Sequence, residues 1–406
     1  MNDKDEISRL INSAWDNEDE TLKTILRDKF EERLLELNIS KNQAVENLEI
    51  ASRTLDGIID GTLKQVDFLS LLKVAQFLEI PYDEITNLYV QAITIKHKDD
   101  LEQSRKRNFI LNNFDLPVLK NMGVIDSIRD FEHIELRLNE IFDLKSITNY
   151  NADDIEAAYS SGKIKPKNLK SRKYFIKKSE SIFKLVDNQN PYKRDALVEY
   201  FPKIRWHSID VENGLLNVMK SLFCLGVTVI FQPKTPALQL RGATFAVNGK
   251  PCIVLTDFRG FYPTLWFALL HELFHVLFDW EEILLKKFHL SDEENDLFIV
   301  KQKEDEANEF AREYMFPQKK MEIINNQISQ RLFIREFALE NHVHPSVIYA
   351  NYAYDNGNEE NNLWGVYQKL MPPINDLIKA LSNGLGANAK VSDFATYYKN
   401  TIFNTI

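Results

Sequence analysis

The chain has 406 residues, more than twice the length of a typical domain, so we expect two or three domains. Its formal net charge of −10 excludes a protein that coats nucleic acid by bulk electrostatic attraction. The 13 glycines and 13 prolines are about half the usual share, and 44% of the residues are hydrophobic. This composition is typical of a helix-rich globular protein and excludes a disordered tail and a β-sandwich.

Cysteine usage predicts the compartment of the protein, and the length of its apolar runs predicts whether it crosses a membrane. Two cysteines, Cys224 and Cys252, are too few for a disulfide framework and favour a reducing, cytoplasmic compartment. The first residues lack a basic segment followed by an apolar one, so we expect no signal peptide. The most apolar stretch, 265–278, is too short and too polar to span a bilayer. We therefore expect a soluble protein without a membrane partner.

Residues 1–95 predict a helical N-terminal domain. Ser40 is well placed to cap one of its helices, and Gly61 closes another. Apolar residues recur at helical spacing in the segments 30–37, 43–48 and 68–78.

Residues 96–200 form a connecting region that is polar and mostly helical in pattern. Its second half contains a basic segment, 161–178, with eight lysines and arginines and no acidic residue. Tyr174 and Phe175 lie within this segment, so contacts with nucleic acid are one interpretation. A solvated linker is the favoured interpretation, because most charge runs are solvated.

Strand-like runs appear after residue 204. The run 225–231 is rich in β-branched residues, and two further runs, 242–247 and 250–255, flank the dipeptide Asn248-Gly249. Asn-Gly between two such runs predicts a β-hairpin. Pro251 has no amide hydrogen, so we expect its strand at the edge of the sheet.

The remainder of the chain is predicted to be helical. We place one domain over 201–355 and a C-terminal tail of unknown role over 356–406. The expected fold class is α+β, mostly helical, with a small sheet in the domain 201–355. Helices are expected over 263–290, 303–316, 333–341 and 345–353.

The helix expected at 263–290 contains an H-E-x-x-H motif, from His271 through Glu272 to His275. The spacing of four places both imidazoles on one face of a helix, where they can bind a single Zn²⁺. Glu272 lies next to that face and can act as a general base. Two core histidines would show this pattern by chance in about one such sequence in a hundred, so the zinc interpretation is favoured.

A catalytic zinc ion needs a third protein ligand and an open position for water. Glu304, in the acidic helix expected at 303–316, could bind the metal. Asn308 lies one turn later on the same face and could bond the distal nitrogen of a ligand histidine. Periodicity does not choose among the acidic residues of this helix. The alternatives to Glu304 are Glu306, Glu309 and Glu313.

The second half of the chain resembles the ImmA/IrrE metallopeptidases. In that family the third ligand is the first glutamate of an E-x-x-A-N-x-F-A pattern, which corresponds to Glu304. Phe274 stands where the family often has glycine, and Tyr-Met-Phe-Pro at 314–317 replaces Leu-Leu-Met-Pro, but neither departure removes a ligand. The resemblance covers 242–255, 265–275 and 304–317, and continues in 334–338 and 343–345.

The resemblance implies a zincin-like peptidase domain. Zinc-bound hydroxide would attack a peptide carbonyl, while Glu272 takes the proton and returns it to the leaving amine. An extended substrate could pair with an exposed strand of the hairpin 244–255. A thiolate at Cys252 could reach the metal, although a buried, inert cysteine is favoured. Candidate donors to the oxyanion are Tyr262, Tyr314 and His344.

Residues 40–85 resemble the lambda-repressor (Xre-like) helix-turn-helix family. Glu49 occupies the turn position where glycine is common, and 51–59 corresponds to the recognition helix. The segment has a net charge of −4, which opposes binding to phosphates, so DNA binding and a protein-interaction role both stay open. The residues that this helix would present to a major groove are Ser52, Arg53 and Asp56.

The leading hypothesis is a cytoplasmic zinc endopeptidase joined to a helix-turn-helix domain, in a transcriptional, stress or mobile-element regulatory circuit. By resemblance, its protein substrate is a helix-turn-helix repressor. The runner-up is a DNA-binding regulator or antitoxin-like protein whose peptidase fold senses or docks without cutting. A zinc-stabilised scaffold is less favoured, because the ligand set leaves an open position. The sequence leaves the trigger and the oligomeric state open.

Overall fold

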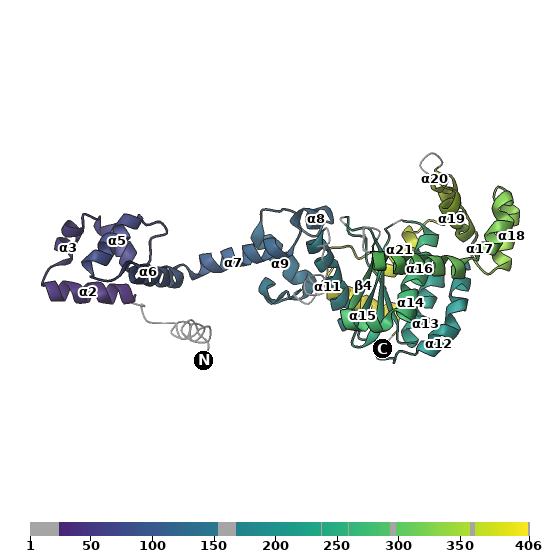
Figure 1. Ribbon diagram of the computed structural model, residues 1–406, viewed down its shortest axis with the longest axis horizontal. Helices are drawn as coiled ribbons and strands as arrows, with labels where there is room; N and C mark the ends of the chain where they lie inside the picture. The colour runs from purple at the N-terminus through teal and green to yellow at the C-terminus, as the bar shows by residue number, and fades with distance from the viewer. Residues whose placement is uncertain are drawn as a thin grey trace. The chain divides into compact units, whose positions relative to one another are not determined.

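The computed structural model describes residues 24–152, 168–236, 238–258, 260–292, 298–357 and 362–404 (Figure 1). The described part is mostly helical and contains one four-stranded mixed sheet, which agrees with the α+β class. The chain forms two compact units, residues 1–107 and 108–406. This division differs from the expected one, because most of the connecting region and the whole C-terminal tail belong to the second unit.

The first unit is a helical bundle around Leu26, Leu55 and Val74. Its helices are α2 (Ile25–Leu37), α3 (Lys41–Leu48), α4 (Ser52–Ile59), α5 (Phe68–Phe77) and α6 (Tyr82–Lys96), and α7 (Lys98–Asn113) contains the boundary between the units. The predicted cap is confirmed: Ser40 Oγ accepts from the amide of Gln43, whose side chain accepts from the amide of Ser40.

A short turn joins α3 to α4. Glu49 ends α3 with φ 52°, in the left-handed region where glycine is usual. Gly61, after α4, has φ +65°, and a Cβ there would lie 2.4 Å from the carbonyl carbon of Ala92 on α6. The glycine therefore permits α4 and α6 to pack closely.

The second unit is built around the sheet. Before the sheet come α8 (Leu116–Asn121), α9 (Phe131–Phe142), the short 3₁₀ helix η1 (Ile147–Asn149), α11 (Leu169–Val186), α12 (Arg194–Tyr200), the 3₁₀ helix η2 (Phe201–Ile209) and α13 (Gly214–Cys224). The strands are β1 (Thr228–Phe231), β2 (Leu240–Val247), β3 (Lys250–Leu255) and β4 (Phe288–Asp292). Between β3 and β4 lie α14 (Tyr262–Phe278) and α15 (Trp280–Lys286).

The helices after the sheet complete the unit. They are α16 (Phe298–Met315), α17 (Gln318–Ile324) with the 3₁₀ turn η3 (Asn325–Gln327), α18 (Arg331–Glu340), α19 (Pro345–Asn356), α20 (Leu363–Tyr367) with the 3₁₀ turn η4 (Gln368–Leu370), α21 (Asn375–Ser382), α22 (Val391–Tyr397) and the π-helix η5 (Tyr398–Ile402). The single helix expected over 263–290 is wrong. Residues 288–290 instead belong to β4.

The strand order is β1-β3-β2-β4, with β1 parallel to β3 and the other pairs antiparallel. The predicted hairpin between β2 and β3 is confirmed, and both turn residues, Asn248 and Gly249, have positive φ. The predicted edge position of Pro251 is wrong, because β3 lies between β1 and β2.

The register explains why proline is tolerated there. Pro251 lies opposite Ala246, whose amide donates to the carbonyl of Lys287, away from β3. Opposed residues of an antiparallel pair turn their amides both inward or both outward, so the nitrogen of Pro251 faces the β1 side. Pairing with β1 begins only at Cys252. The missing amide therefore breaks no ladder hydrogen bond.

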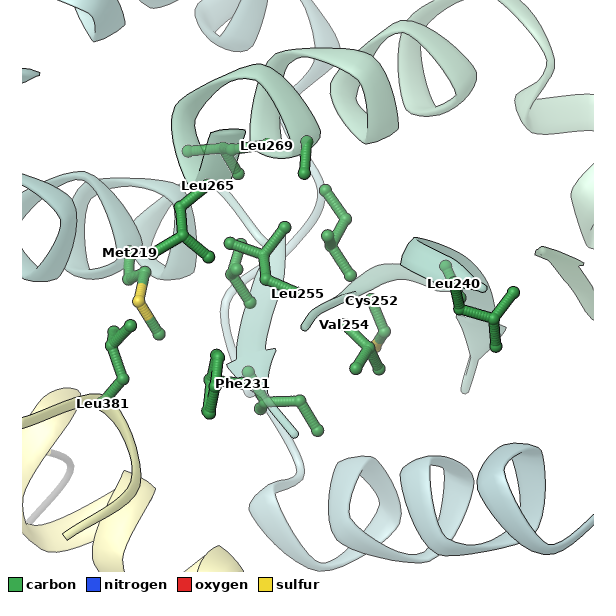
Figure 2. Close-up of a cluster of buried hydrophobic side chains, with 14 of the residues drawn as sticks. Met219, Phe231, Leu240, Cys252, Val254, Leu255, Leu265, Leu269 and Leu381 are labelled. Carbon is green, nitrogen blue, oxygen red and sulfur yellow. The ribbon is translucent and has the colours of Figure 1, made fainter. Parts of the chain in front are cut away.

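Helices cover both faces of the sheet. On one face, Gly242 and Thr244 of β2 contact α14, which is almost entirely buried. On the other face, the ring of Phe245 lies 5.7 Å from that of Phe183 on α11. Figure 2 shows Leu265 of α14 in one apolar cluster with residues of the strands. No helix among the described residues is long and apolar enough to cross a membrane.

The C-terminal stretch and the end of the basic segment form part of this core. Tyr398 Oη accepts from the amide of Phe231 at 2.7 Å and donates to the carbonyl of Leu381 at 2.9 Å. Lys178 of α11 is 3% exposed, and its Nζ donates to the carbonyl of Ala387 at 2.6 Å. The solvated-linker interpretation is therefore wrong for residues 171–178, most of which are buried, while residues 161–167 lie outside the described part.

Candidate metal centre

Three side chains from two helices converge on one point. His271 and His275, one turn apart on α14, place their Nε2 atoms 3.3 Å from each other. Glu304 of α16 places Oε2 3.2 Å from Nε2 of His271, and Oε1 3.5 Å from Nε2 of His275. Ligands bound tetrahedrally at about 2.0–2.1 Å from a zinc ion lie about 3.3 Å apart. The three donors therefore have the spacing of three corners of a zinc site.

The packing of α14 against α16 separates Glu304 from the other acidic residues of its helix. Glu304 alone of them joins the two histidines in a group of potential metal ligands. The three alternatives are all exposed: Glu306, Glu309 and Glu313. The open choice among the four acidic residues is thereby narrowed to Glu304.

Asp279 orients the second histidine. Nδ1 of His275 donates to Oδ2 of Asp279 at 2.8 Å, and Nζ of Lys303 donates to the other carboxylate oxygen at 2.8 Å. Burial alone would raise the pKa of Asp279, but the two cationic partners lower it to about 2. Burial would likewise lower the pKa of His275, but Asp279 and Glu304 raise it to about 9. A carboxylate–histidine pair of this kind is the usual support of a ligand histidine.

The role predicted for Asn308 is corrected by this arrangement. Its Oδ1 accepts from Nη1 of Arg241 on β2 at 3.4 Å, and the distal nitrogen of His275 is bonded to Asp279. Asp279 lies one turn after His275 on the chain, and a carboxylate is a stronger acceptor than an amide. His271 Nδ1 is buried and has no hydrogen-bond partner among the described residues.

His289 is a site residue that the sequence reasoning missed. It lies on β4, with Nε2 2.6 Å from Oε1 of Glu304 and its ring 4.1 Å from that of His275. A separation of 2.6 Å is a hydrogen bond and is shorter than the edge of a zinc tetrahedron. His289 therefore donates to one oxygen of Glu304, and the other oxygen could hold a metal ion. Burial would raise the pKa of Glu304, but its three histidine partners hold it well below the usual range.

Glu272, the residue after His271, is fully buried and close enough to His275 to raise the pKa of that histidine. Oε2 accepts a hydrogen bond from Oγ1 of Thr244 at 2.7 Å, whereas Oε1 has no partner among the described residues. Gly242 makes room for this carboxylate, since a Cβ there would lie 2.6 Å from Oε1. One oxygen is thus held in place, and the other is available to accept a proton.

The three candidate oxyanion donors are engaged elsewhere. The hydroxyl of Tyr262 is buried and donates to the carbonyl of Ser208 at 2.6 Å. The ring of Tyr314 packs on Phe310, and His344 caps α19 through Nδ1.

The structure also bears on the expectations for Cys252 and for the hairpin. Cys252 lies in the apolar core, where burial raises the pKa of its thiol to about 12 (Figure 2). This agrees with an inert cysteine. Both strands of the hairpin are paired on two sides, so neither offers an edge to a peptide. The edge strand beside the cluster is β4, which carries His289.

The residues proposed for DNA contact lie at the start of α4. Ser52 and Arg53 are exposed, whereas Asp56 is half-buried and forms an ion pair with Lys41 at 2.5 Å. That pairing partly neutralises the one carboxylate expected to face a groove. DNA binding stays a prediction.

Comparisons of this chain with family models, curated proteins and solved structures found no match.

Proposed function

We propose that the chain is a zinc-dependent endopeptidase of the ImmA/IrrE type. The observation that carries this proposal is the convergence of His271, His275 and Glu304 at zinc-site spacing, with the buried carboxylate of Glu272 nearby. Three protein ligands leave a fourth position for water, which is the arrangement of catalytic zinc sites.

Each residue has a defined part in this proposal. The metal would be held by Nε2 of both histidines and by Oε2 of Glu304. A bound zinc ion would supply a water molecule of lowered pKa and polarise the peptide carbonyl. Oε1 of Glu272 accepts the proton from water and later delivers it to the leaving amine, while Thr244 holds the carboxylate in position.

The proposed substrate is an extended segment of a protein, and by resemblance a helix-turn-helix repressor. Among the described residues, β4 is paired only with β2, so its other side can accept a further strand. A peptide on that side would pass next to His289. The N-terminal unit would bind either the repressor itself or the DNA to which the repressor is bound. It would do so through the exposed start of α4, and would thereby bring the substrate to the peptidase unit.

A cleavage assay tests the peptidase proposal. Wild-type protein, stripped of metal and reloaded with zinc, is expected to cut a mixed peptide pool, and the stripped protein is not. Glu272→Gln keeps the shape of the side chain but cannot accept the proton, so it should bind zinc normally and cut about 10²–10⁴-fold more slowly. Equal cleavage by zinc-loaded wild type and zinc-loaded Glu272→Gln, or no cleavage by the zinc-loaded wild type, would refute the proposal.

A further inference from the structure

A cavity of about 430 Å³ opens beside the metal cluster. This volume lies within the usual range for ligand pockets, about 300–1,000 Å³. Its walls come from β2, α14, α16, α19 and α20, and most of them are apolar or aromatic. Phe261 and Trp364, which both line it, stack with ring centroids 5.4 Å apart, and Tyr354 is a third aromatic lining residue.

The cavity shares a wall with the cluster. Phe267 lies one turn before His271 on α14, and the two rings are 6.1 Å apart. The guanidinium of Arg241 lies over Phe267 at 5.6 Å and also donates to Asn308, one turn after Glu304. The cavity therefore begins about one helical turn, roughly 5.4 Å, from the metal ligands. A side chain next to a scissile bond at the cluster can reach it.

The charged groups of the wall select against cationic occupants. Arg312 lies over the ring of Tyr354 at 4.6 Å and is paired with Asp355. A lysine side chain would be repelled by the two guanidinium groups. A carboxylate would compete with Asp355 for Arg312 and would displace the neutral amide of Asn308 from Arg241, so an acidic occupant is the alternative that the Glu pool tests. A flat, uncharged ring gains stacking on both arginines and on the aromatic walls.

We propose that this cavity binds an aromatic side chain of the polypeptide substrate, at a position adjacent to the cleaved bond. The inference rests on the proposed function and adds the substrate class to it. Tyr354 and Trp364 are then specificity-determining residues, because they wall the cavity without contacting the metal ligands.

The test compares blocked octapeptide pools in which one central position is fixed as Phe, Ala, Lys or Glu. With zinc-loaded wild-type protein, kcat/KM for the Phe pool should exceed that for the Ala pool by about tenfold or more. Tyr354→Ala, at a side chain that is 57% exposed, should fold normally and reduce this ratio several-fold. Trp364→Ala provides a second reading. Trp206→Ala is the control, because this tryptophan is 46% exposed and lies outside the cavity; it should leave the Phe-to-Ala ratio unchanged.

Binding of the same pools to zinc-loaded Glu272→Gln separates this inference from the peptidase proposal. Tighter binding of the Phe pool, lost in the double variant with Tyr354→Ala, supports the aromatic pocket even if no pool is cut. Cleavage without preference would leave the peptidase standing and overturn the pocket. Equal binding of all pools, or binding of none, would also overturn it.

Discussion

Replacement of Lys178 by methionine should stabilise the second unit. Burial lowers the pKa of Lys178 from 10.5 to about 7, although its contacts with the Ala387 carbonyl and the Phe394 ring favour the charged form. The unfolded chain therefore binds more protons than the folded one between pH 7 and 10.5, and stability rises with pH across that range.

The size of the expected stabilisation follows from the change in the pKa of Lys178. A difference of about 3.5 pKa units corresponds to about 4–5 kcal/mol, most of which opposes folding at pH 7. Methionine removes this cost but also loses a hydrogen bond of about 1 kcal/mol. The unfolding free energy of Lys178→Met at pH 7 should therefore exceed that of the wild type by about 2–4 kcal/mol. The difference should shrink toward pH 10.

Urea unfolding followed by tryptophan fluorescence measures this effect, because every tryptophan except Trp15 lies in the second unit. Lys184→Met is the matched control, since Lys184 lies on the same helix but is 53% exposed. Its stability should change by less than about 0.5 kcal/mol. A destabilised Lys178→Met, or a stability difference that does not vary with pH, would refute the buried placement of this lysine.

Three further changes probe the metal cluster. Asp279→Ala removes the hydrogen-bond acceptor of His275 and should weaken zinc binding about 10–100-fold, measured by competition with a chromogenic chelator. Asn308→Ala should bind zinc with nearly the wild-type affinity. A larger loss of affinity in Asn308→Ala than in Asp279→Ala would favour the pairing with Asn308 that the sequence predicted. His289→Ala frees one oxygen of Glu304 and should weaken zinc binding by about tenfold in the same assay; unchanged affinity would show that Glu304 needs no such support. Gly242→Ala places a methyl group against Glu272, so peptide cleavage should fall steeply while zinc content stays normal; unaltered cleavage would show that the carboxylate has room to move.

The sequence predicted the features that depend on residues close together in the chain. The H-E-x-x-H spacing placed two histidines on one helical face, the turn Asn248-Gly249 specified a hairpin, and Ser40 capped its helix. The choice of Glu304 came from the resemblance, because four glutamates share an acidic helix. Only the packing of α16 on α14 distinguishes them in the structure.

The errors arise where distant segments meet. Pro251 is tolerated inside the sheet because the pairing of β3 with β1 begins one residue later, at Cys252. The residues around Pro251 do not reveal where the earlier strand β1 will start to pair. His289 was hidden because one long helix was expected where a strand in fact pairs with β2. The burial of Lys178 depends on a C-terminal segment more than two hundred residues away. Charge and periodicity are local quantities, so they could not anticipate these contacts.

Zinc content after dialysis against a zinc-buffered solution tests the central claim most directly. The wild type and Glu309→Gln, which alters an exposed residue of the same helix, should each retain about one zinc ion per chain. Glu304→Gln should lose most of it, because the third ligand of the cluster is gone. Equal zinc in all three proteins, or none in the wild type, would contradict a metal centre formed by His271, His275 and Glu304.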